Sequence, residues 1–367
     1  MNTDKLKVLL LGGTGAMGIH LTHILAERGF EVYVTSRKKR VSNNSNIRYL
    51  EGNAMDTSFV LNLLKSNNFY GMVDFMLYFR NEEFASKVTQ YLQYVKQYVY
   101  ISSARVYADS PQPLIESSKR LLDVSTDNDF LSFNEYALRK ARQEDILTHS
   151  GKTNWTIIRP YITFSENRFQ LGVLEKEDWL HRVLSGRTLV FSKDMLDKKT
   201  TLTYGYNVAE GIAAIVGKTE ELGNVFHITN SKSYTWKEIY DAYIKVLTQY
   251  MGAEVKVKFL TRAINYDNKY SKYQVIYDRY FNREFDNSKI NKFCDTNKFV
   301  PTLEGLEQCM LTFCKNPSYT ILNPYREALL DKLTKEVATP KDFPSYKIWV
   351  KYIVCRFFIS SNILKKL

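Results

Sequence analysis

The feature that most constrains the fold of this chain is a run of three glycines spaced three residues apart. Gly12, Gly15 and Gly18 directly follow an apolar segment, residues 6–11, and a helical pattern leaves them. Where a strand leads through a glycine loop directly into a helix, the unpaired N–H groups of the helix N-terminus and the positive end of its dipole lie close together. Such a point attracts a pyrophosphate, so this loop predicts a dinucleotide site. A glycine-rich turn without a ligand is the alternative interpretation.

Each residue of the loop is a candidate for contact with the cofactor. Gly12 suits the tight turn, Gly15 lets a phosphate approach the main chain, and Gly18 lets the helix pack closely on the strand. The candidate cofactor-binding residues of the loop are Gly12, Gly13, Thr14, Gly15, Ala16, Met17 and Gly18.

Strands and helices are expected to alternate as far as Pro160. The apolar and periodic segments predict strands at 6–11, 31–35, 47–50, 72–79, 97–101 and 155–158. Helical patterns lie between them at 16–28, 57–65, 82–96 and 133–148. This order predicts right-handed crossovers and an α/β fold built on a doubly wound parallel sheet.

After Pro160 the pattern is looser. Helices are expected at 171–184, 207–216, 235–250 and 302–314, and strands at 188–191, 224–228 and 254–259. We therefore expect a Rossmann-type dinucleotide-binding domain over residues 1–165 and a smaller mixed α/β substrate lobe over 166–315, interleaved with the first. A basic extension follows over 316–367.

Composition limits the class of protein. The 367 residues are 44% hydrophobic, which is enough for a substantial core. We expect no signal peptide before the first strand, and no apolar run reaches the roughly 20 residues that a membrane-spanning helix needs. The four cysteines lie late in the chain without metal-ligand spacing, so we expect reduced, buried thiols and no metal site. These features predict a cytoplasmic protein.

The formal net charge of +12 suits anionic ligands, although a generally solvated basic surface is the default interpretation. The cations are scattered and no nucleic-acid motif is visible, so a small anionic substrate is expected rather than a nucleic acid. The tail from Ser345 is apolar and basic without acidic residues. It is interpreted either as an amphipathic helix on a membrane surface or partner, or as a helix packed on the protein's own body, and the second interpretation is favoured.

A second group of residues carries chemistry. Tyr136 and Lys140 are four apart on a predicted helix, which places both on one face, and a nearby ammonium stabilises a phenolate. Such a lysine would make Tyr136 a proton-transfer group near neutral pH. Taken alone, the spacing is more typical of a surface pair, and the next residues are what favour a functional role. Ser103 follows the predicted strand 97–101, where hydroxyls face the ligand crevice of a parallel sheet. For Ser102, local hydrogen bonding at the strand end is the more plausible role.

Together these segments resemble the extended short-chain dehydrogenase/reductase family, also called the NAD-dependent epimerase/dehydratase family. The resemblance runs from residue 5 to about residue 300 and comprises, in the family's order, the glycine loop and the segments 102–107, 136–140, 158–160 and 204–211. It implies catalytic roles for Ser103, Tyr136 and Lys140, and a reach of Lys140 to the cofactor ribose. It also implies that the turn 51–54 contacts the adenine, which makes Asn53 and Ala54 candidates.

The end of the predicted strand 31–35 indicates which nicotinamide cofactor fits. An NAD enzyme usually has a carboxylate there for the ribose 2′-hydroxyl, and this chain has none. Arg37 and Lys38 suit a 2′-phosphate, Arg37 better because its guanidinium is planar and bidentate, and Ser36 adjoins them. The cofactor is therefore predicted to be NADP, with NAD as the alternative.

The family resemblance implies an NAD(P)-dependent epimerase or reductase that acts on a nucleotide sugar, and it is compatible with a homodimer. Sugar-nucleotide dehydratases of the family carry an Asp-Glu pair after the catalytic hydroxyl residue, where this chain has Ala104 and Arg105, so dehydration is disfavoured. A dinucleotide- or RNA-binding regulatory protein without catalysis is the alternative function.

Overall fold

The computed structural model describes residues 5–268, 271–319 and 322–366. Residues 1–4 of the predicted first domain, 269 and 270 of the predicted substrate lobe, and 320, 321 and 367 of the predicted extension lie outside the described residues.

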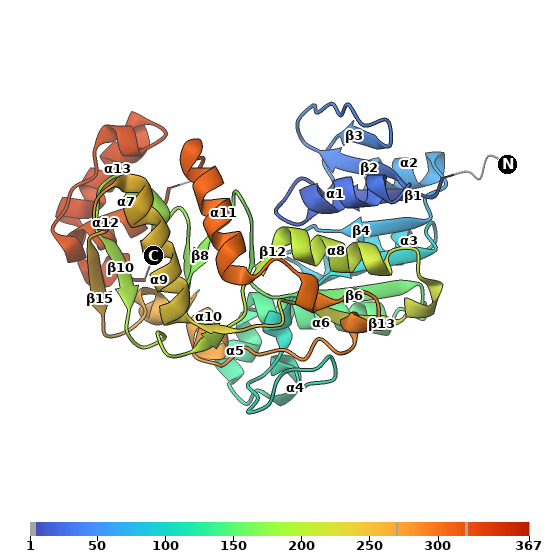
Figure 1. Cartoon of the computed structure of the whole chain (residues 1–367). Helices are drawn as coiled ribbons and strands as arrows, with labels where there is room; N and C mark the ends of the chain where they lie inside the picture. The colour runs from blue at the N-terminus through green and yellow to red at the C-terminus, as the bar shows by residue number, and fades with distance from the viewer. Residues whose placement is uncertain (1–4, 269–270, 320–321, 367) are drawn as a thin grey trace.

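A seven-stranded parallel sheet forms the larger lobe (Figure 1). Its strand order is β13-β6-β5-β4-β1-β2-β3, so the order reverses between β1 and β4. Ligands of such sheets bind in the crevice at the carboxyl ends of the strands, at this switch point. The strands are β1 (Lys7–Leu11), β2 (Glu31–Ser36), β3 (Ile47–Glu51), β4 (Gly71–Asp74), β5 (Gln97–Ile101), β6 (Trp155–Pro160) and β13 (Asn224–Ile228). The predicted doubly wound α/β fold is confirmed.

Helices cover both faces of this sheet (Figure 1). Because side chains of a strand alternate, Val8 and Leu10 of β1 pack on one face and Leu9 and Leu11 on the other, and all four are fully buried. The first face is covered by α1 (Gly18–Glu27) and α8 (Gly205–Ile215). The second face is covered by α2 (Thr57–Ser66), α3 (Asn81–Tyr91) and α6 (Tyr136–Thr148).

The predicted strand 72–79 is wrong beyond Asp74. The Asp74 carboxylate accepts a hydrogen bond from the Met76 backbone N–H at 2.8 Å, which turns the chain out of the sheet. The apolar run continues in the sequence because Tyr78 is also buried. Its hydroxyl donates a hydrogen bond to the same Asp74 carboxylate at 2.7 Å. Phe79, in contrast, is 64% exposed.

The predicted helix 171–184 is also wrong over most of its length. Gly172 takes a φ of +59°, and the chain folds back so that β8 (Gln170–Leu171) pairs antiparallel with β9 (Leu174–Glu175). Only the end of the segment is helical, as α7 (Leu180–Leu184). The apolar residues of segment 171–184 are spaced as they are because they are buried in the compact smaller lobe, and they do not form one face of a single helix.

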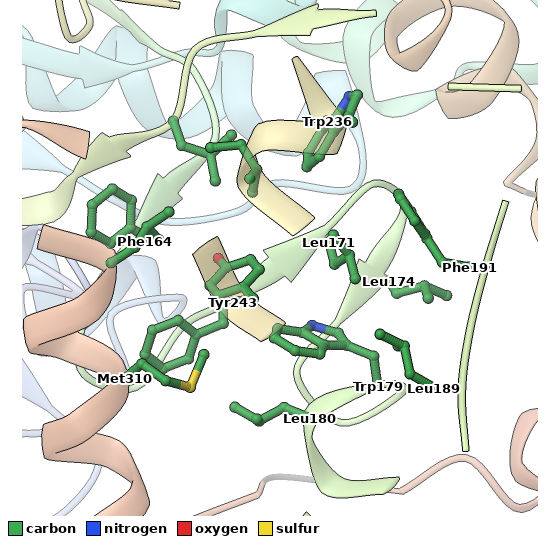
Figure 2. Packing of buried hydrophobic residues seen from close by; sticks show 14 of the residues in the cluster. Phe164, Leu171, Leu174, Trp179, Leu180, Leu189, Phe191, Trp236, Tyr243 and Met310 are labelled. Carbon is green, nitrogen blue, oxygen red and sulfur yellow. The ribbon is translucent and has the colours of Figure 1, made fainter. Parts of the chain in front are cut away.

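The smaller lobe has its own core, in which Trp179, Trp236 and Tyr243 pack together with Phe164 and Met310 (Figure 2). Two of the free cysteines, Cys309 and Cys314, belong to this core. Its other elements are β7 (Thr163–Phe164), β10 (Leu189–Ser192), β11 (Lys199–Thr200), β12 (Thr203–Tyr204), β14 (Tyr234–Thr235), α9 (Trp236–Met251), β15 (Val257–Leu260), α10 (Lys272–Gln274) and α11 (Thr302–Lys315).

Two further groups of helices complete the fold. Short helices α4 (Leu121–Val124) and α5 (Asn128–Phe133) precede α6, and the chain ends in α12 (Pro324–Thr334), α13 (Tyr346–Phe358) and α14 (Ser361–Leu364). The last three form a small core of their own at the far end of the smaller lobe (Figure 1). In the part of the chain that the structure describes, no helix has the length and apolarity to cross a bilayer.

Candidate active site

The glycine loop joins β1 to α1 at the switch point of the sheet. Gly12 takes a φ of +70°, and its N–H donates to Thr35 Oγ1 at 3.0 Å, which ties the loop to the end of β2. A Cβ on Gly18 would lie 2.5 Å from the Cα of Gly13, so only glycine allows α1 to start here. A Cβ on Gly15 would meet nothing within 4 Å, which leaves the loop open to an approaching phosphate.

The N-terminus of α1 suits an anion. No side chain caps it, and its first turn carries no acidic residue. The N–H groups at the N-terminus of α1 and the helix dipole therefore create a positive electrostatic potential at the open loop. The loop residues present fit a pyrophosphate.

The turn after β2 is basic. Ser36 is buried and exchanges hydrogen bonds with the backbone of Lys38, from its Oγ to the Lys38 oxygen at 2.8 Å and from the Lys38 N–H at 3.2 Å. The side chains of Arg37 and Lys38 are exposed and make no ion pair among the described residues. They remain available to a phosphate.

The turn after β3 is shaped by its own backbone contacts. Asn53 Oδ1 accepts from the Met55 N–H at 3.0 Å, and Ala54 is buried in the core beneath β3 and β1. This brings the predicted adenine turn to the same edge of the sheet as the glycine loop and the basic turn, because β1, β2 and β3 are parallel neighbours.

Two serines follow β5 and have different surroundings. Ser102 Oγ donates to Glu144 at 2.6 Å, so it joins the strand to α6. Ser103 caps a single 3₁₀ turn, Ala104–Val106, by accepting from the Arg105 N–H at 3.2 Å. Within the described residues the Ser103 hydroxyl donates to no acceptor, so its proton is available to a ligand oxygen.

Tyr136 is the first residue of α6, and its position is set by the two residues before it. Asn134 takes the left-handed conformation with a φ of 52°, which ends α5 sharply. Glu135 then caps α6 by accepting from the Ala137 N–H at 2.6 Å. The predicted helix 133–148 therefore begins three residues late, and this places Tyr136 at the N-terminal end of α6 instead of inside a longer helix.

Lys140 lies one turn further along and is buried, 3% exposed. Its ammonium donates to the Ile101 carbonyl oxygen at 2.8 Å and to the Tyr100 hydroxyl at 3.0 Å. Burial lowers the pKa of Lys140 to about 8, against the attraction of Asp74, which raises it. These two hydrogen bonds hold α6 against the carboxyl end of β5, where Ile101 lies two residues before Ser103.

Tyr136 and Lys140 lie four residues apart on α6. No hydrogen bond joins their side chains among the residues that the structure describes. Burial raises the pKa of Tyr100, and the neighbouring Tyr136 adds to this rise. The phenol that the Lys140 ammonium contacts directly is that of Tyr100.

Charged groups of the smaller lobe reach this site through Arg105. Its guanidinium lies 5.1 Å from the centre of the Tyr136 ring and donates to Glu135 at 2.5 Å. It also lies 3.5 Å from the buried carboxylate of Asp278, which Arg279 and Arg283 bind as well. The two carboxylates beside the site are therefore neutralised by arginines.

Other basic and aromatic residues that could have met a substrate lie elsewhere. Trp179 and Arg182 are fully buried, the first in the lobe core and the second on Glu327 and Asp331 of α12. His181 is buried, and burial lowers its pKa to about 4. Lys176 donates to the Ser318 carbonyl, and Arg168 to Thr163.

Sequence reasoning missed the residues behind Lys140. Tyr98 and Tyr78 both donate to buried Asp74 at 2.7 Å, and Tyr100 bonds to Gln143 as well as Lys140. The available signal was the alternation of β5, which puts Tyr98 and Tyr100 on one buried face where their hydroxyls need partners. Asp278 gave no signal, because its segment has no clear periodicity.

Comparison with known proteins gives a match to a domain model and a shared fold. Residues 12–187 match a family model described as NAD(P)H-binding. A chloroplast stem-loop binding protein of 41 kDa from Arabidopsis thaliana is 24% identical over 249 residues, which cover 64% of this chain and 61% of that protein. The match thus spans less than two thirds of the plant protein's length.

Solved structures resemble the chain over most of its length. dTDP-glucose 4,6-dehydratase from Bacillus anthracis, in complex with NAD, gives a TM-score of 0.64 at 14% identity and covers 85% of this chain and 97% of that one. UDP-glucuronic acid 4-epimerase from Bacillus cereus, in complex with UDP-glucuronic acid and NAD, gives 0.62 at 16% identity and covers 84% and 99%. Residues 12–187 thus match an NAD(P)H-binding model, and the chain has the fold of these dehydratase and epimerase structures.

Proposed function

We propose that the protein is an NADP-dependent epimerase or reductase of a nucleotide sugar or a similar hydroxylated anionic substrate. Ser103, Tyr136 and Lys140 would be its catalytic residues. One observation carries the proposal: the buried Lys140 ammonium binds the end of β5 at Ile101, which brings α6 and Tyr136 beside the strand that presents Ser103. A protein that only binds a dinucleotide has no need of a buried ammonium next to a phenol.

The residues divide the chemistry between them. Bound nicotinamide supplies or accepts a hydride. Tyr136 takes the proton from the substrate hydroxyl as it becomes a carbonyl, and returns a proton in the reverse direction. Ser103 donates a hydrogen bond to the same oxygen, and Lys140 stabilises the Tyr136 phenolate. In an epimerase the substrate would turn and regain hydrogen on its other face, whereas a reductase would need new reduced cofactor in each cycle.

The cofactor would lie across the first three strands. The loop from Gly12 to Gly18 would hold the pyrophosphate, and Asn53 and Ala54 the adenine. Arg37, with Ser36 and Lys38, would bind a 2′-phosphate, because no carboxylate competes at the end of β2. These contacts favour NADP over NAD.

The position of Arg105 supports hydride chemistry without loss of water. A dehydratase needs a free carboxylic acid and a base next to the substrate. Ala104 is fully buried, and Glu135 and Asp278 are both engaged by Arg105. Support for the substrate class comes from the similarly folded Bacillus cereus epimerase, whose structure holds UDP-glucuronic acid.

The proposal is tested by incubating the purified protein with a panel of nucleotide sugars and either NADP(H) or NAD(H), followed by product mass. An isomer of unchanged mass identifies an epimerase, and a gain of two hydrogens with oxidation of NADPH identifies a reductase. Loss of water would contradict the argument from Arg105. The absence of any product, in a protein shown to bind NADP, would contradict the catalytic assignment.

A second function has one observation in its favour. The Arabidopsis relative is named for binding a stem-loop. An RNA-binding role for this chain would use its positive charge and would weaken steeply with salt. Salt-dependent RNA binding that persists without cofactor, together with an inert nucleotide-sugar panel, would favour it over the enzyme.

A further inference from the structure

The C-terminal helix α13 has two faces of different character. Its inner face packs on α12, where Tyr352 and Cys355 are buried and the Tyr352 hydroxyl donates to Asp331 at 2.5 Å. The Trp349 indole donates to the Ala338 carbonyl at 3.1 Å. The expected packing of this tail on the body of the protein accounts for this face alone.

The outer face of α13 is apolar and uncovered. Tyr346, Val350, Val354 and Phe357 are spaced by four, four and three residues, so they form one stripe along the helix. Their exposed fractions are 67%, 41%, 46% and 55%, and that of the adjacent Phe358 is 82%. Scattered exposed apolar residues are ordinary, but a continuous stripe of this kind marks an interaction surface.

The charge around the stripe has one sign. Between Ser345 and Lys366 there are five cations and no Asp or Glu. Lys347 and Lys351, one turn apart and both exposed, border the stripe on one side. Lys365 is paired with Asp267, and Lys351 lies 4.4 Å from the centre of the Tyr325 ring while remaining exposed. Lys347, Lys351 and the exposed Lys366 are therefore the charges offered to a partner.

The apolar stripe together with the positive charge beside it indicates which kind of partner this face of α13 binds. A second copy of the chain, docked stripe to stripe, would bring the lysines of both copies together without an acidic partner within the segment. An anionic bilayer accepts both features, since the aromatic and aliphatic side chains enter the acyl boundary and the lysines extend to the phosphates.

We propose that the outer face of α13 docks this protein on a membrane surface rich in anionic lipid. The helix lies on the bilayer, because α13 has 13 residues and its inner face is occupied by α12. Helix α13 lies at the end of the molecule away from the parallel sheet (Figure 1). Docking through this helix therefore leaves the candidate active site at the strand ends free. The proposal is independent of the proposed catalytic function.

The test is flotation of the full-length protein with vesicles of phosphatidylcholine alone or of phosphatidylcholine with phosphatidylglycerol. We expect binding to the anionic vesicles only, weakened by salt. At limiting lipid, the vesicle-bound fraction should be at least tenfold lower than that of the parent protein in each of two double variants, Phe357→Ser/Phe358→Ser and Lys347→Glu/Lys351→Glu. Val41→Ser, at an equally exposed apolar site, and Lys245→Glu/Lys315→Glu, at exposed sites on α9 and α11, should bind as the parent does.

Unchanged thermal unfolding and NADP binding would show that the variants are folded. No binding to anionic vesicles would overturn the proposal, as would equal binding to both vesicle types or full binding by the lysine variant. Concentration-dependent dimerisation that the Phe357→Ser/Phe358→Ser variant abolishes, without vesicle binding by the parent, would assign the stripe to a second copy instead.

Discussion

The contact between Tyr100 and Lys140 gives a prediction that is specific to this chain. Replacing Tyr100 by Phe removes the hydroxyl that accepts from the Lys140 ammonium at 3.0 Å and leaves the Ile101 carbonyl as the remaining acceptor. The ammonium is 3% exposed, so water does not readily replace the lost partner. The charged form of Lys140 should therefore become harder to maintain.

The size of the effect follows from the contact. A hydrogen bond to a charged group contributes about 1.5–3 kcal/mol, which corresponds to about one to two pKa units. The pKa of Lys140 is already lowered by burial to about 8. In the proposed mechanism the charged ammonium stabilises the Tyr136 phenolate, so activity should fall as pH rises through about 8, and in Tyr100→Phe this fall should begin about one to two pH units lower.

The assay is the pH dependence of kcat/KM for the nucleotide sugar found active. Tyr33→Phe is a matched control, since Tyr33 is also buried on this face of the sheet but its hydroxyl contacts Glu31. It should keep the alkaline limb of the parent. An unshifted limb in Tyr100→Phe, with the protein folded, would refute the account of Lys140.

The same buried lysine affects stability. Because its pKa is lower in the folded than in the unfolded chain, the folded state binds fewer protons between about pH 8 and the ordinary lysine range, and the free energy of unfolding should rise with pH there. Lys140→Met should lose that rise in urea titrations, and an identical slope in both proteins would contradict it. Arg37→Ala should weaken NADP binding about tenfold or more and leave NAD binding unchanged in fluorescence titrations, whereas Lys65→Ala should alter neither. Gly18→Ala should lower the free energy of unfolding by about 1–3 kcal/mol, and Gly15→Ala should leave it unchanged but weaken NADP binding; equal stability of the two variants would contradict the packing described for α1.

The sheet was predictable because its signals are local. Strands buried on both faces give unbroken apolar runs, and glycines give the turn into α1, so β1, β2, β3 and β5 lie within a residue or two of their predicted bounds. The two errors arose where burial does not follow one period. Tyr78 extends the apolar run of β4, yet it lies outside the sheet and its hydroxyl donates to the buried Asp74 carboxylate. Gly172 reverses the chain within a segment whose apolar spacing predicts a helix.

For the candidate site, the sequence suggested residues but not the contacts that hold them. Placement at strand ends and helical spacing suggested Ser103, Tyr136 and Lys140. The partner that holds Lys140 comes from the pairing of β5 with its neighbours and the packing of α6 on it, which no short motif encodes. Asp278 reaches Arg105 from a segment more than 150 residues away in sequence, so its role depends on the folded smaller lobe.

The role of Tyr136 is the central claim, and hydride transfer in Tyr136→Phe tests it most directly. With NADP and the active nucleotide sugar, this variant should bind cofactor as the parent does but lose turnover by about 10²–10⁴-fold, the usual contribution of a positioned proton-transfer group. Tyr94→Phe, which removes a hydroxyl from an exposed site remote from the crevice, should keep full activity. Turnover by Tyr136→Phe at the parent rate would contradict the account.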